Sequence, residues 1–491
     1  MTDRQPAEVE IVKQIDENLS SPTPLEYGID EKNDYDQAYL AAPKSTRFYR
    51  GVLFQMILFG TLSFVGPSLN DAISNLGGGG LKDPDLANLA QALSSTCTCL
   101  VALFGGPIIN KIGIKYACTI SGFSFFLTGS GFYVNIKYGV QWYLLLAKIV
   151  IGVTNGFVYV AESTAMLTYP RAHERGKYIG IWSAMRNSGG ILGGAISVGT
   201  NYKSSGAGAV SRATYLIFLG FECSGPIWAF LLTPTRKVRR SDGQRVPQSK
   251  DISWKKELLA LWGHFQHKRT WIVALPSFYS FFFLGTFSTY LATHFSVRAR
   301  ALSSLISTVG AVGLALLYGR YLDSRRFSRH ARVWWGMGIV LVPQVAAFIW
   351  IGIEWHKYPN KVALDYKLEP GPWARAYFPY LIMFIAGFCF QIYLYWILAA
   401  FSNDLKAASR VGGTFRAFET AGQATAFGLV SKSYRAQKTL YFNAALMVPA
   451  FIFLLWLVKL MPEEPSEVDD LLVGTKVGEE EREIEEKDVK E

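Results

Sequence analysis

Long apolar runs recur along almost the whole of this 491-residue chain, and they constrain its fold more than any other feature. A helix of about 20 apolar residues crosses the hydrocarbon core of a bilayer, and lipid offers the backbone no hydrogen-bond partner, so segments of this length cross as helices. Suitable runs centre on residues 51–74, 88–109, 115–134, 141–166, 177–200, 212–233, 270–295, 301–320, 333–355, 376–401, 411–431 and 438–460. The sequence therefore predicts an all-α integral membrane protein with twelve transmembrane helices.

The placement of Lys and Arg predicts the orientation. Cytoplasmic loops of membrane proteins carry an excess of these bases. Here the larger share falls in segments on the same side as the N-terminus, and the richest segment is 234–269, between the sixth and seventh runs. We therefore expect a multi-pass protein with both termini in the cytoplasm.

Five segments follow from the runs and the charges. They are a disordered cytoplasmic N-tail at 1–46, an N-terminal six-helix half at 47–233, a basic cytoplasmic linker at 234–269, a C-terminal six-helix half at 270–460 and an acidic cytoplasmic C-tail at 461–491. Dense charge and few aromatic residues predict disorder in the tails. The first 46 residues contain no apolar run, so no signal peptide is expected.

An internal repeat supports the division into halves. The second run ends in Gly-x-x-x-Asn at 106–110 and the eighth in Gly-x-x-x-Asp at 319–323, and bases follow both. Residues 185–189 of the fifth run likewise align with 418–422 of the eleventh. Two copies of one six-helix unit predict two pseudo-symmetric six-helix bundles.

These loop motifs resemble the Gly-x-x-x-Asp-Arg-x-Gly-Arg-Lys signature of the major facilitator superfamily. The residues that carry this gating-loop motif are Gly106, Asn110, Lys111, Gly113, Lys115, Gly319, Asp323 and Arg325. A weaker superfamily pattern in the fourth helix is matched by Lys148, Gly152 and Gly156. The stretches 68–80 and 174–201 resemble fungal members of the branch named for the nematode "uncoordinated" ion-channel regulatory protein. The resemblance covers about residues 47–460.

The resemblance implies roles for particular residues. Asn110 stands where the signature has Asp, whereas the second copy keeps Asp323. By analogy, Asp323 should contact the inner start of the fifth helix near residues 176–179, where the helix dipole favours an anion. The fourth, seventh and tenth helices are expected to line a central cavity.

No catalytic constellation is present in the sequence. The six histidines are scattered, and neither a Gly-x-Ser-x-Gly motif nor a phosphate-binding loop occurs, so we expect no enzyme activity, cofactor or metal centre. The four glycines at 77–80 are most simply a flexible turn. The net charge of +11 does not indicate nucleic acid, because the bases flank apolar runs and face lipid headgroups.

Ionisable residues at membrane depth are the candidate site, because charges are costly there. Lys148, Asn155 and Glu162 recur every seven residues and so share one face of the fourth helix. The resemblance implies that Lys148 contacts an anionic substrate or modulates a proton site and that Glu162 titrates. The alternative is a structural charge pair with a neighbouring helix.

Arg186 and Asn187 lie near the middle of the fifth helix. An unpaired guanidinium is costly there, so Arg186 should meet an acid such as Glu162 or Glu419, or face a wet cavity. Arg416 and Glu419 are three residues apart on the eleventh helix and can satisfy one another locally.

Aromatic stretches in the seventh and tenth helices are explained mainly by packing. Their expected place at the cavity nevertheless makes Gln391 and Trp396 substrate candidates. The full set of substrate or coupling candidates is Lys148, Asn155, Glu162, Arg186, Asn187, Gln391, Trp396, Arg416 and Glu419.

Two classes of function remain open. One is secondary transport of a small solute by alternating access, driven by a proton gradient or by the solute's own gradient. The other is a non-transporting regulator or trafficking partner of another membrane protein. Charges retained in the cavity favour transport, whereas cavity helices filled by bulky apolar residues favour the regulator. The lipid bilayer is the partner that both readings require.

The charge pattern yields a direct test of topology. A reporter fused after Lys459 and another inserted near Gln244 should both report the cytoplasmic side, because the bases follow the positive-inside rule. Protease protection of sealed vesicles would check the placement. An external signal from either reporter would contradict the twelve-helix topology.

Overall fold

The computed structural model describes residues 35–460, apart from 172–173, 247–261, 264, 267, 325, 358–362, 400–404 and 433–434. Within this part the chain is almost entirely helical, and extended pairing is limited to isolated bridges. The predicted tails up to residue 34 and from residue 461, and much of the predicted linker, lie outside the described residues.

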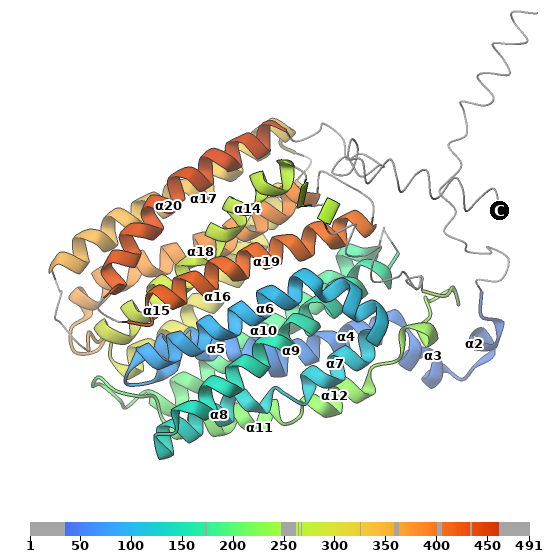
Figure 1. The fold of residues 1–491 in the computed structure, drawn as a ribbon, viewed down its shortest axis with the longest axis horizontal. Helices are drawn as coiled ribbons and strands as arrows, with labels where there is room; N and C mark the ends of the chain where they lie inside the picture. Colours follow the sequence, from blue (N-terminus) through green and yellow to red (C-terminus); the bar gives the residue numbers. More distant parts are fainter. Residues whose placement is uncertain are drawn as a thin grey trace, which may run out of the picture.

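The helices fall into an N-terminal and a C-terminal group. The N-terminal group comprises α4 (Val52–Ser63), α5 (Leu69–Ser74), α6 (Pro84–Ile112), α7 (Ile114–Gly122), α8 (Phe126–Tyr138), α9 (Gln141–Thr168), α10 (Arg175–Asn201), α11 (Arg212–Glu222) and α12 (Gly225–Leu231). The C-terminal group comprises α14 (Lys268–Ser280), α15 (Phe282–His294), α16 (Val297–Asp323), α17 (Arg329–Lys357), α18 (Pro370–Ala399), α19 (Leu405–Leu429) and α20 (Ala436–Lys459). Figure 1 shows the two groups lying one above the other.

Ten helical segments in the described part are long and apolar enough to cross a membrane. They are Val52–Ser74, Pro84–Gly105, Ile114–Tyr138, Gln141–Met166, Arg212–Leu231, Thr270–His294, Val297–Asp323, Arg329–Lys357, Pro370–Leu398 and Ala436–Lys459. Helices α10 and α19 are similar in length, with 27 and 25 residues, but Gly, Ser, Thr and Arg make them more polar. Large apolar side chains such as Leu317, Val342 and Ile452 point outward, as contact with lipid requires.

The first apolar run is interrupted near its middle. A π-helical turn, η1 (Phe64–Ser68), joins α4 to α5 and contains Pro67, which has no backbone N–H to donate to the helix. Gly66 lies so close to the ring of Phe125 that a Cβ atom there would be 2.5 Å from it. Such π-helical turns often occur at functional sites, and this one sets the direction of α5.

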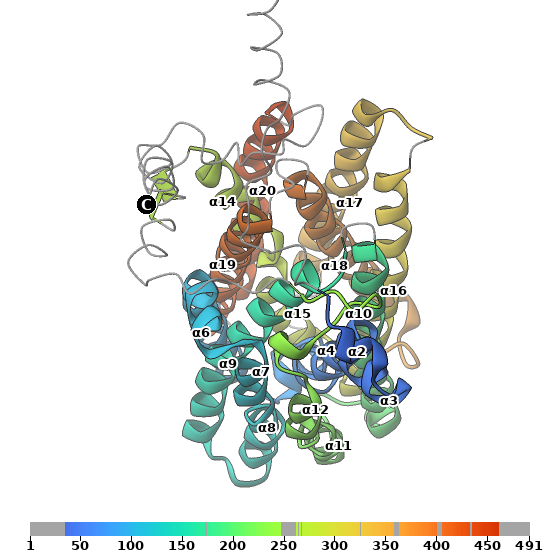
Figure 2. The same ribbon diagram turned by 90° about the vertical axis from the view of Figure 1, so that its right-hand side faces the viewer.

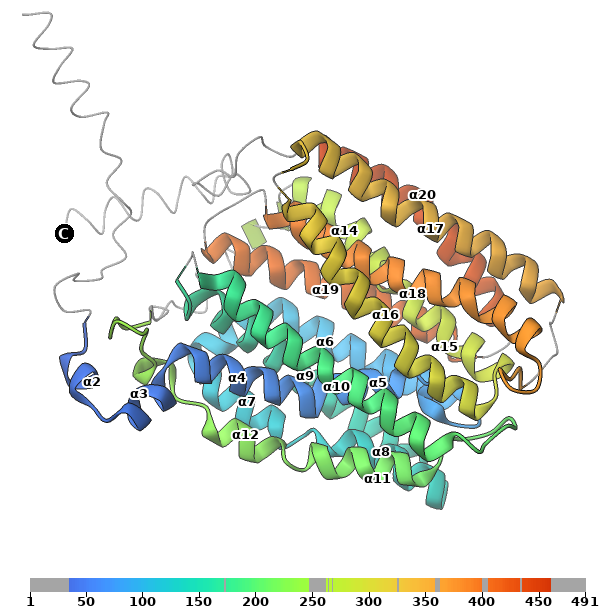
Figure 3. The same cartoon turned by 180° about the vertical axis from the view of Figure 1, so that it is seen from behind.

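Two pairs of helices carry most of the contact between the groups. Helix α6 packs along α19, and α10 packs along α16 (Figures 1 and 3). A Cβ atom on Gly194 of α10 would lie 2.7 Å from the Cα atom of Leu305 in α16. The small residues of the fifth run therefore allow close helix approach inside the protein.

Residues 35–46 are ordered, although they belong to the segment predicted as a disordered tail. They contain α2 (Gln37–Ala41) and the start of α3 (Lys44–Arg50), which lie at one end of the molecule in Figure 1 and face the viewer in Figure 2. Asp36 accepts a hydrogen bond from the Tyr39 N–H at the start of α2 and forms an ion pair with Arg239 at 2.8 Å. This ion pair fixes the end of the N-terminal tail to the start of the linker.

A buried ion pair fixes the loop before α18 to the start of α16. Arg298 donates to both carboxylate oxygens of Asp365, and the Ser296 hydroxyl donates at 2.6 Å. The Lys367 N–H donates to the same carboxylate at 2.8 Å. Burial by itself would raise the pKa of Asp365, but these donors outweigh it and lower the pKa to about 2.

Asp365→Asn should destabilise the protein by about 3 to 5 kcal/mol, because it leaves the buried Arg298 guanidinium without its anion. The folded-state pKa lies below the usual value, so the carboxylate stabilises the fold above about pH 4 and this stabilisation is lost as the pH falls toward 2. Thermal unfolding in detergent would measure both effects. Asp323→Asn, an exposed carboxylate, is the matched control and should change neither.

Candidate functional site

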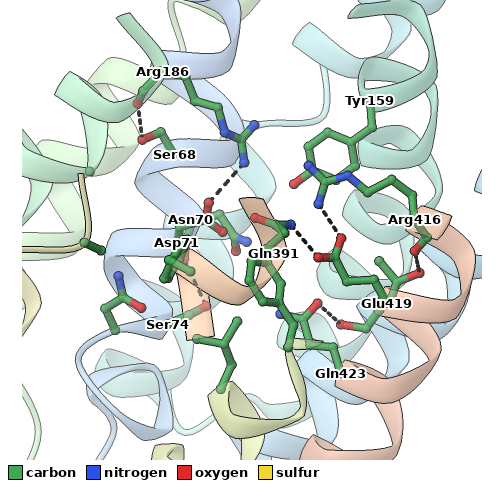
Figure 4. A pocket seen from close by; sticks show the side chains of 18 of the residues that line it. Ser68, Asn70, Asp71, Ser74, Tyr159, Arg186, Gln391, Arg416, Glu419 and Gln423 are labelled. Carbon is green, nitrogen blue, oxygen red and sulfur yellow. Dashed lines mark hydrogen bonds and ion pairs between the residues drawn. The ribbon is translucent and has the colours of Figure 1, made fainter. Parts of the chain in front are cut away.

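A cavity of about 780 Å³ lies between the two helix groups. Side chains of α5, α6, α9 and α10 line it from the N-terminal group, and side chains of α15, α16, α18 and α19 line it from the C-terminal group. Figure 4 shows its charged and polar residues pointing toward one another from both groups. Two of these helices, α10 and α19, are the more polar ones described above.

The N-terminal wall holds a weak ion pair. Arg186 of α10 donates to Asp71 of α5 at 3.3 Å, and the Asp71 side chain is 52% exposed in the cavity. The Ser68 hydroxyl donates to the Arg186 backbone carbonyl at 2.7 Å and so links the π-helical turn to α10. The Arg186 guanidinium also lies 5.4 Å from the ring centre of Tyr159. The acid that meets Arg186 is thus Asp71, and not Glu162 or Glu419.

The C-terminal wall holds a stronger ion pair. Arg416 donates to Glu419 at 2.5 Å, the local pairing that their spacing allowed. Glu419 is 1% exposed and also accepts a hydrogen bond from Gln391 of α18. Arg416 is 30% exposed and lies 5.6 Å from the same Tyr159 ring. Tyr159 therefore contacts an arginine from each group.

The candidates on α9 have different surroundings. Lys148 lies behind the cavity wall and donates to the amide oxygens of Asn70 at 2.5 Å and Gln91 at 3.2 Å. Asn155 lines the cavity. Glu162 is buried and accepts a hydrogen bond from Ser63 at 2.5 Å, and its second oxygen has no hydrogen-bond partner among the described residues.

Of the remaining candidates, two line the cavity and one lies away from it. Asn187 lines the cavity and donates to the Ser183 hydroxyl at 3.1 Å. Gln391 also lines the cavity. Trp396 packs instead against Tyr393, and Arg332 lies 5.8 Å from its ring centre.

One end of the cavity is closed by Arg300, near the start of α16. Its side chain is fully buried and donates across the two groups to the backbone carbonyls of Leu76 at 2.8 Å, Gly77 at 2.6 Å and Gly208 at 3.0 Å, with a longer bond to Leu81. In the part of the chain that the structure describes, no carboxylate lies at ion-pair distance from it. Four carbonyls thus replace the usual anion.

The glycines at 77–80 build part of this closure, and the expectation of a flexible turn there was wrong. Gly77 to Gly80 have φ angles of +71°, +51°, +57° and +78°, which favour glycine, and all four are buried. The Gly78 N–H donates to the Ser288 hydroxyl at 2.9 Å, and the Tyr215 hydroxyl donates to the Gly79 carbonyl at 2.5 Å. The turn packs tightly against both groups, and its carbonyls accept hydrogen bonds from Arg300.

Asn88 adds a second link at the same end. Its amide donates to Thr289 at 2.8 Å and to the Val430 carbonyl at 3.1 Å, and its oxygen accepts from Ser288 at 2.7 Å. Val297 and Ala301 of α16 also join a hydrophobic cluster of the N-terminal group. The closure therefore combines buried polar and apolar contacts.

The gating-loop motif lies at the opposite ends of α6 and α16. Gly113 ends α6 with a φ of +86°, Lys115 donates to the Phe230 carbonyl at 3.0 Å, and Lys111 is exposed. Asp323 is exposed and, within the described residues, makes no hydrogen bond or ion pair. Gly319 has open space beside it. The side chains of Asn110 and of residues 176 and 179, together with Gly106 and Arg325, are outside the described set.

Three residues of the site were not predicted from the sequence: Asp71, Tyr159 and Arg300. Asp71 could have been found, because it lies inside the first apolar run and the rule applied to Arg186 applies equally to it. Tyr159 lies between Asn155 and Glu162 but carries no charge to mark it. Arg300 stands at the edge of an apolar run, where a base normally suggests a lipid headgroup contact.

Comparisons with known proteins agree with this geometry. A family model described as Major Facilitator Superfamily matches residues 51–363. The Notoamide biosynthesis cluster protein O' of Aspergillus versicolor is 32% identical to this chain, over 83% of it and 90% of that protein. UNC93-like protein 1 of Arabidopsis thaliana is 26% identical, over 85% and 92%. The resemblance to the superfamily and to its UNC93-like branch is thereby confirmed.

Solved structures show the same fold. A bacterial homolog of the human lysosomal transporter Spinster, inward-facing and occupied, matches with a TM-score of 0.57 and 15% identity, over 85% of this chain and 98% of that one. A D-xylose-proton symporter matches with a TM-score of 0.54 and 14% identity, over 84% and 98%. The family model and the relatives match most of the chain, and its helices and central cavity agree with them. The chain therefore belongs to the major facilitator superfamily.

Proposed function

We propose that this protein is a secondary transporter that moves a small solute by alternating access. The observation that supports the proposal best is a charged cavity between two helix groups that is closed at one end by buried contacts. Alternating access requires a central site that opens to one side at a time. Cavity walls filled with bulky apolar side chains would have favoured the regulator, whereas four charged residues remain here.

The proposal includes twelve spanning helices in two pseudo-symmetric bundles, with α10 and α19 crossing the membrane as well. The repeat relates α6 to α16 and α10 to α19. Exchange of the two halves therefore converts the α6 contact with α19 into the α16 contact with α10, and both contacts occur. This exchange is the relation that rocking of two similar halves requires.

The orientation of the cycle follows from the charge pattern. With both termini in the cytoplasm, the Arg300 closure lies on the far side and the cavity opens inward. The exposed Asp323 and Lys111 then lie at the cytoplasmic ends, where they would meet partners in the opposite state.

We propose Glu162 as the group that exchanges a proton if transport is proton-coupled. It is buried beside the cavity with a hydroxyl as its partner, and no base lies at ion-pair distance in the described part of the chain. Carboxyl groups in such surroundings are candidates for proton relays in transporters.

A gradient-driven uptake screen on purified protein in liposomes tests the proposed function. Transport of at least one small solute against an empty-liposome control is the expected result. A protein that moves no solute but co-purifies stoichiometrically with another membrane protein would instead be the regulator that the UNC93-like relatives leave open.

Arg186→Gln should reduce uptake of the transported solute at least tenfold while leaving the fold nearly intact. The Arg186 pair with Asp71 is partly exposed, so its loss should change stability by no more than about 1 kcal/mol. Uptake and thermal unfolding would be measured on the same preparation. Lys148→Met is the contrasting variant, because it leaves the amide oxygen of the buried Asn70 without its donor and should destabilise the fold.

Arg300→Gln should open the closed end. Hydrogen bonds to charged groups contribute about 1.5 to 3 kcal/mol, so the population with this end open should rise about tenfold or more. Spin labels at Lys203→Cys and Lys367→Cys, in a background without the native cysteines, would report the distance across that end. Arg320→Gln, on the exposed opposite end of α16, is the control. An unchanged distance distribution in Arg300→Gln would contradict the closure.

A further inference from the structure

The two walls of the cavity differ in chemistry. The N-terminal wall is polar and contributes side chains such as Ser68, Asn70, Asp71, Gln91, Asn155 and Asn187. The C-terminal wall adds an aromatic surface made by Phe281, Phe283, Phe287, Tyr380, Phe384 and Phe388. A solute that fills this space must therefore be amphipathic, with a ring-bearing body and a polar head.

The charges that face the cavity are balanced. Asp71 and Arg186 come from the N-terminal group, and Arg416 and Glu419 come from the C-terminal group. Two acids and two bases give the cavity wall no net charge that would favour an anion or a cation. At membrane depth, the net charge of a charged solute would have no counter-charge in the cavity. A solute without net charge needs none.

The Asp71 pair is arranged to accept a dipolar head. Its atoms are 3.3 Å apart, longer than the 2.7 to 2.9 Å of a strong charge-assisted bond. Both side chains are reachable from the cavity, and Asp71 has its second oxygen free for a donor, since no other bond to that carboxylate is found among the described residues. Glu419, in contrast, is covered and already bound by Arg416 and Gln391.

We propose that the cavity binds an aromatic solute with a compact zwitterionic head of the α-amino-acid type. Its ammonium group lies against Asp71, its carboxylate against Arg186 beside Tyr159, and its ring against the aromatic wall. The spacing fits, because the two charges of such a head are separated by about the same few ångströms as those of the ion pair. This inference rests on the proposed function and names the class of solute.

Three matched fluorescent probes with one dansyl body test the head group. Nε-dansyl-lysine carries both charges, dansylcadaverine is the same molecule without the carboxylate, and N-dansyl-6-aminohexanoate lacks the ammonium group. Each would be titrated against the purified full-length protein in nanodiscs. The expected result is a Kd for Nε-dansyl-lysine at least tenfold lower than for either singly charged probe.

Two variants separate the two contacts. Asp71→Asn should weaken Nε-dansyl-lysine at least tenfold and leave N-dansyl-6-aminohexanoate within threefold of the wild type. Arg186→Gln should weaken Nε-dansyl-lysine and leave dansylcadaverine within threefold. Asp83→Asn, an exposed carboxylate before α6 and outside the cavity, is the control and should bind all three probes like the wild type. Thermal unfolding of each variant would verify that it is folded.

The inference is overturned if either singly charged probe binds as tightly as Nε-dansyl-lysine, if none of the three binds above the background of empty nanodiscs, or if the folded Asp71→Asn variant keeps the wild-type preference. Because binding is measured without a gradient, its outcome is independent of transport. Selective binding with no uptake into liposomes would contradict the proposed transport function and support the zwitterion site. Uptake of a solute with net charge, without selective binding, would support transport and contradict the zwitterion site.

Discussion

Polar groups carried to membrane depth must find partners inside the protein, and most of the described architecture follows from that constraint. Arg300 satisfies it with backbone carbonyls, and Lys148 does so with two amide oxygens. Arg186 and Arg416 satisfy it with acids that face a shared cavity. Each solution ties one helix to another, so the polar residues also determine which helices lie side by side.

Small residues make these polar contacts geometrically possible. Gly193 and Gly194 of α10 let it approach α5 and α16 closely, and the turn of four glycines with positive φ angles leaves the carbonyls of Leu76, Gly77 and Leu81 to Arg300. A Cβ atom would lie 2.6 Å from Ala72 at Gly193 and 2.7 Å from Leu305 at Gly194, so a side chain at either position would push the helices apart. The same residues lower the hydropathy of α10, which is why a polar, glycine-rich helix lies at the interface and the more apolar helices face lipid.

The two ends of the cavity are held by different kinds of interaction. At the closed end, Arg300 and Asn88 are buried and hydrogen-bonded across the two groups. At the opposite end, Asp323 and Lys111 are exposed. A buried network must be broken as a whole, so the closed end has a defined closed state. A cavity with one closed end suits the proposed carrier better than a pore.

The membrane setting, the helical class, the superfamily and the contacts that are local in the chain could all be predicted from the sequence. Run length and lipid chemistry suffice for the first two, and the Arg416 bond to Glu419 follows from their spacing on one helix. No sequence pattern indicated that Arg186 meets Asp71, 115 residues away, or that Arg300 meets Leu76, 224 residues away, because these contacts depend on how the helices pack. Helical periodicity states which residues share a face, but the helix that this face meets depends on the packing of all the others.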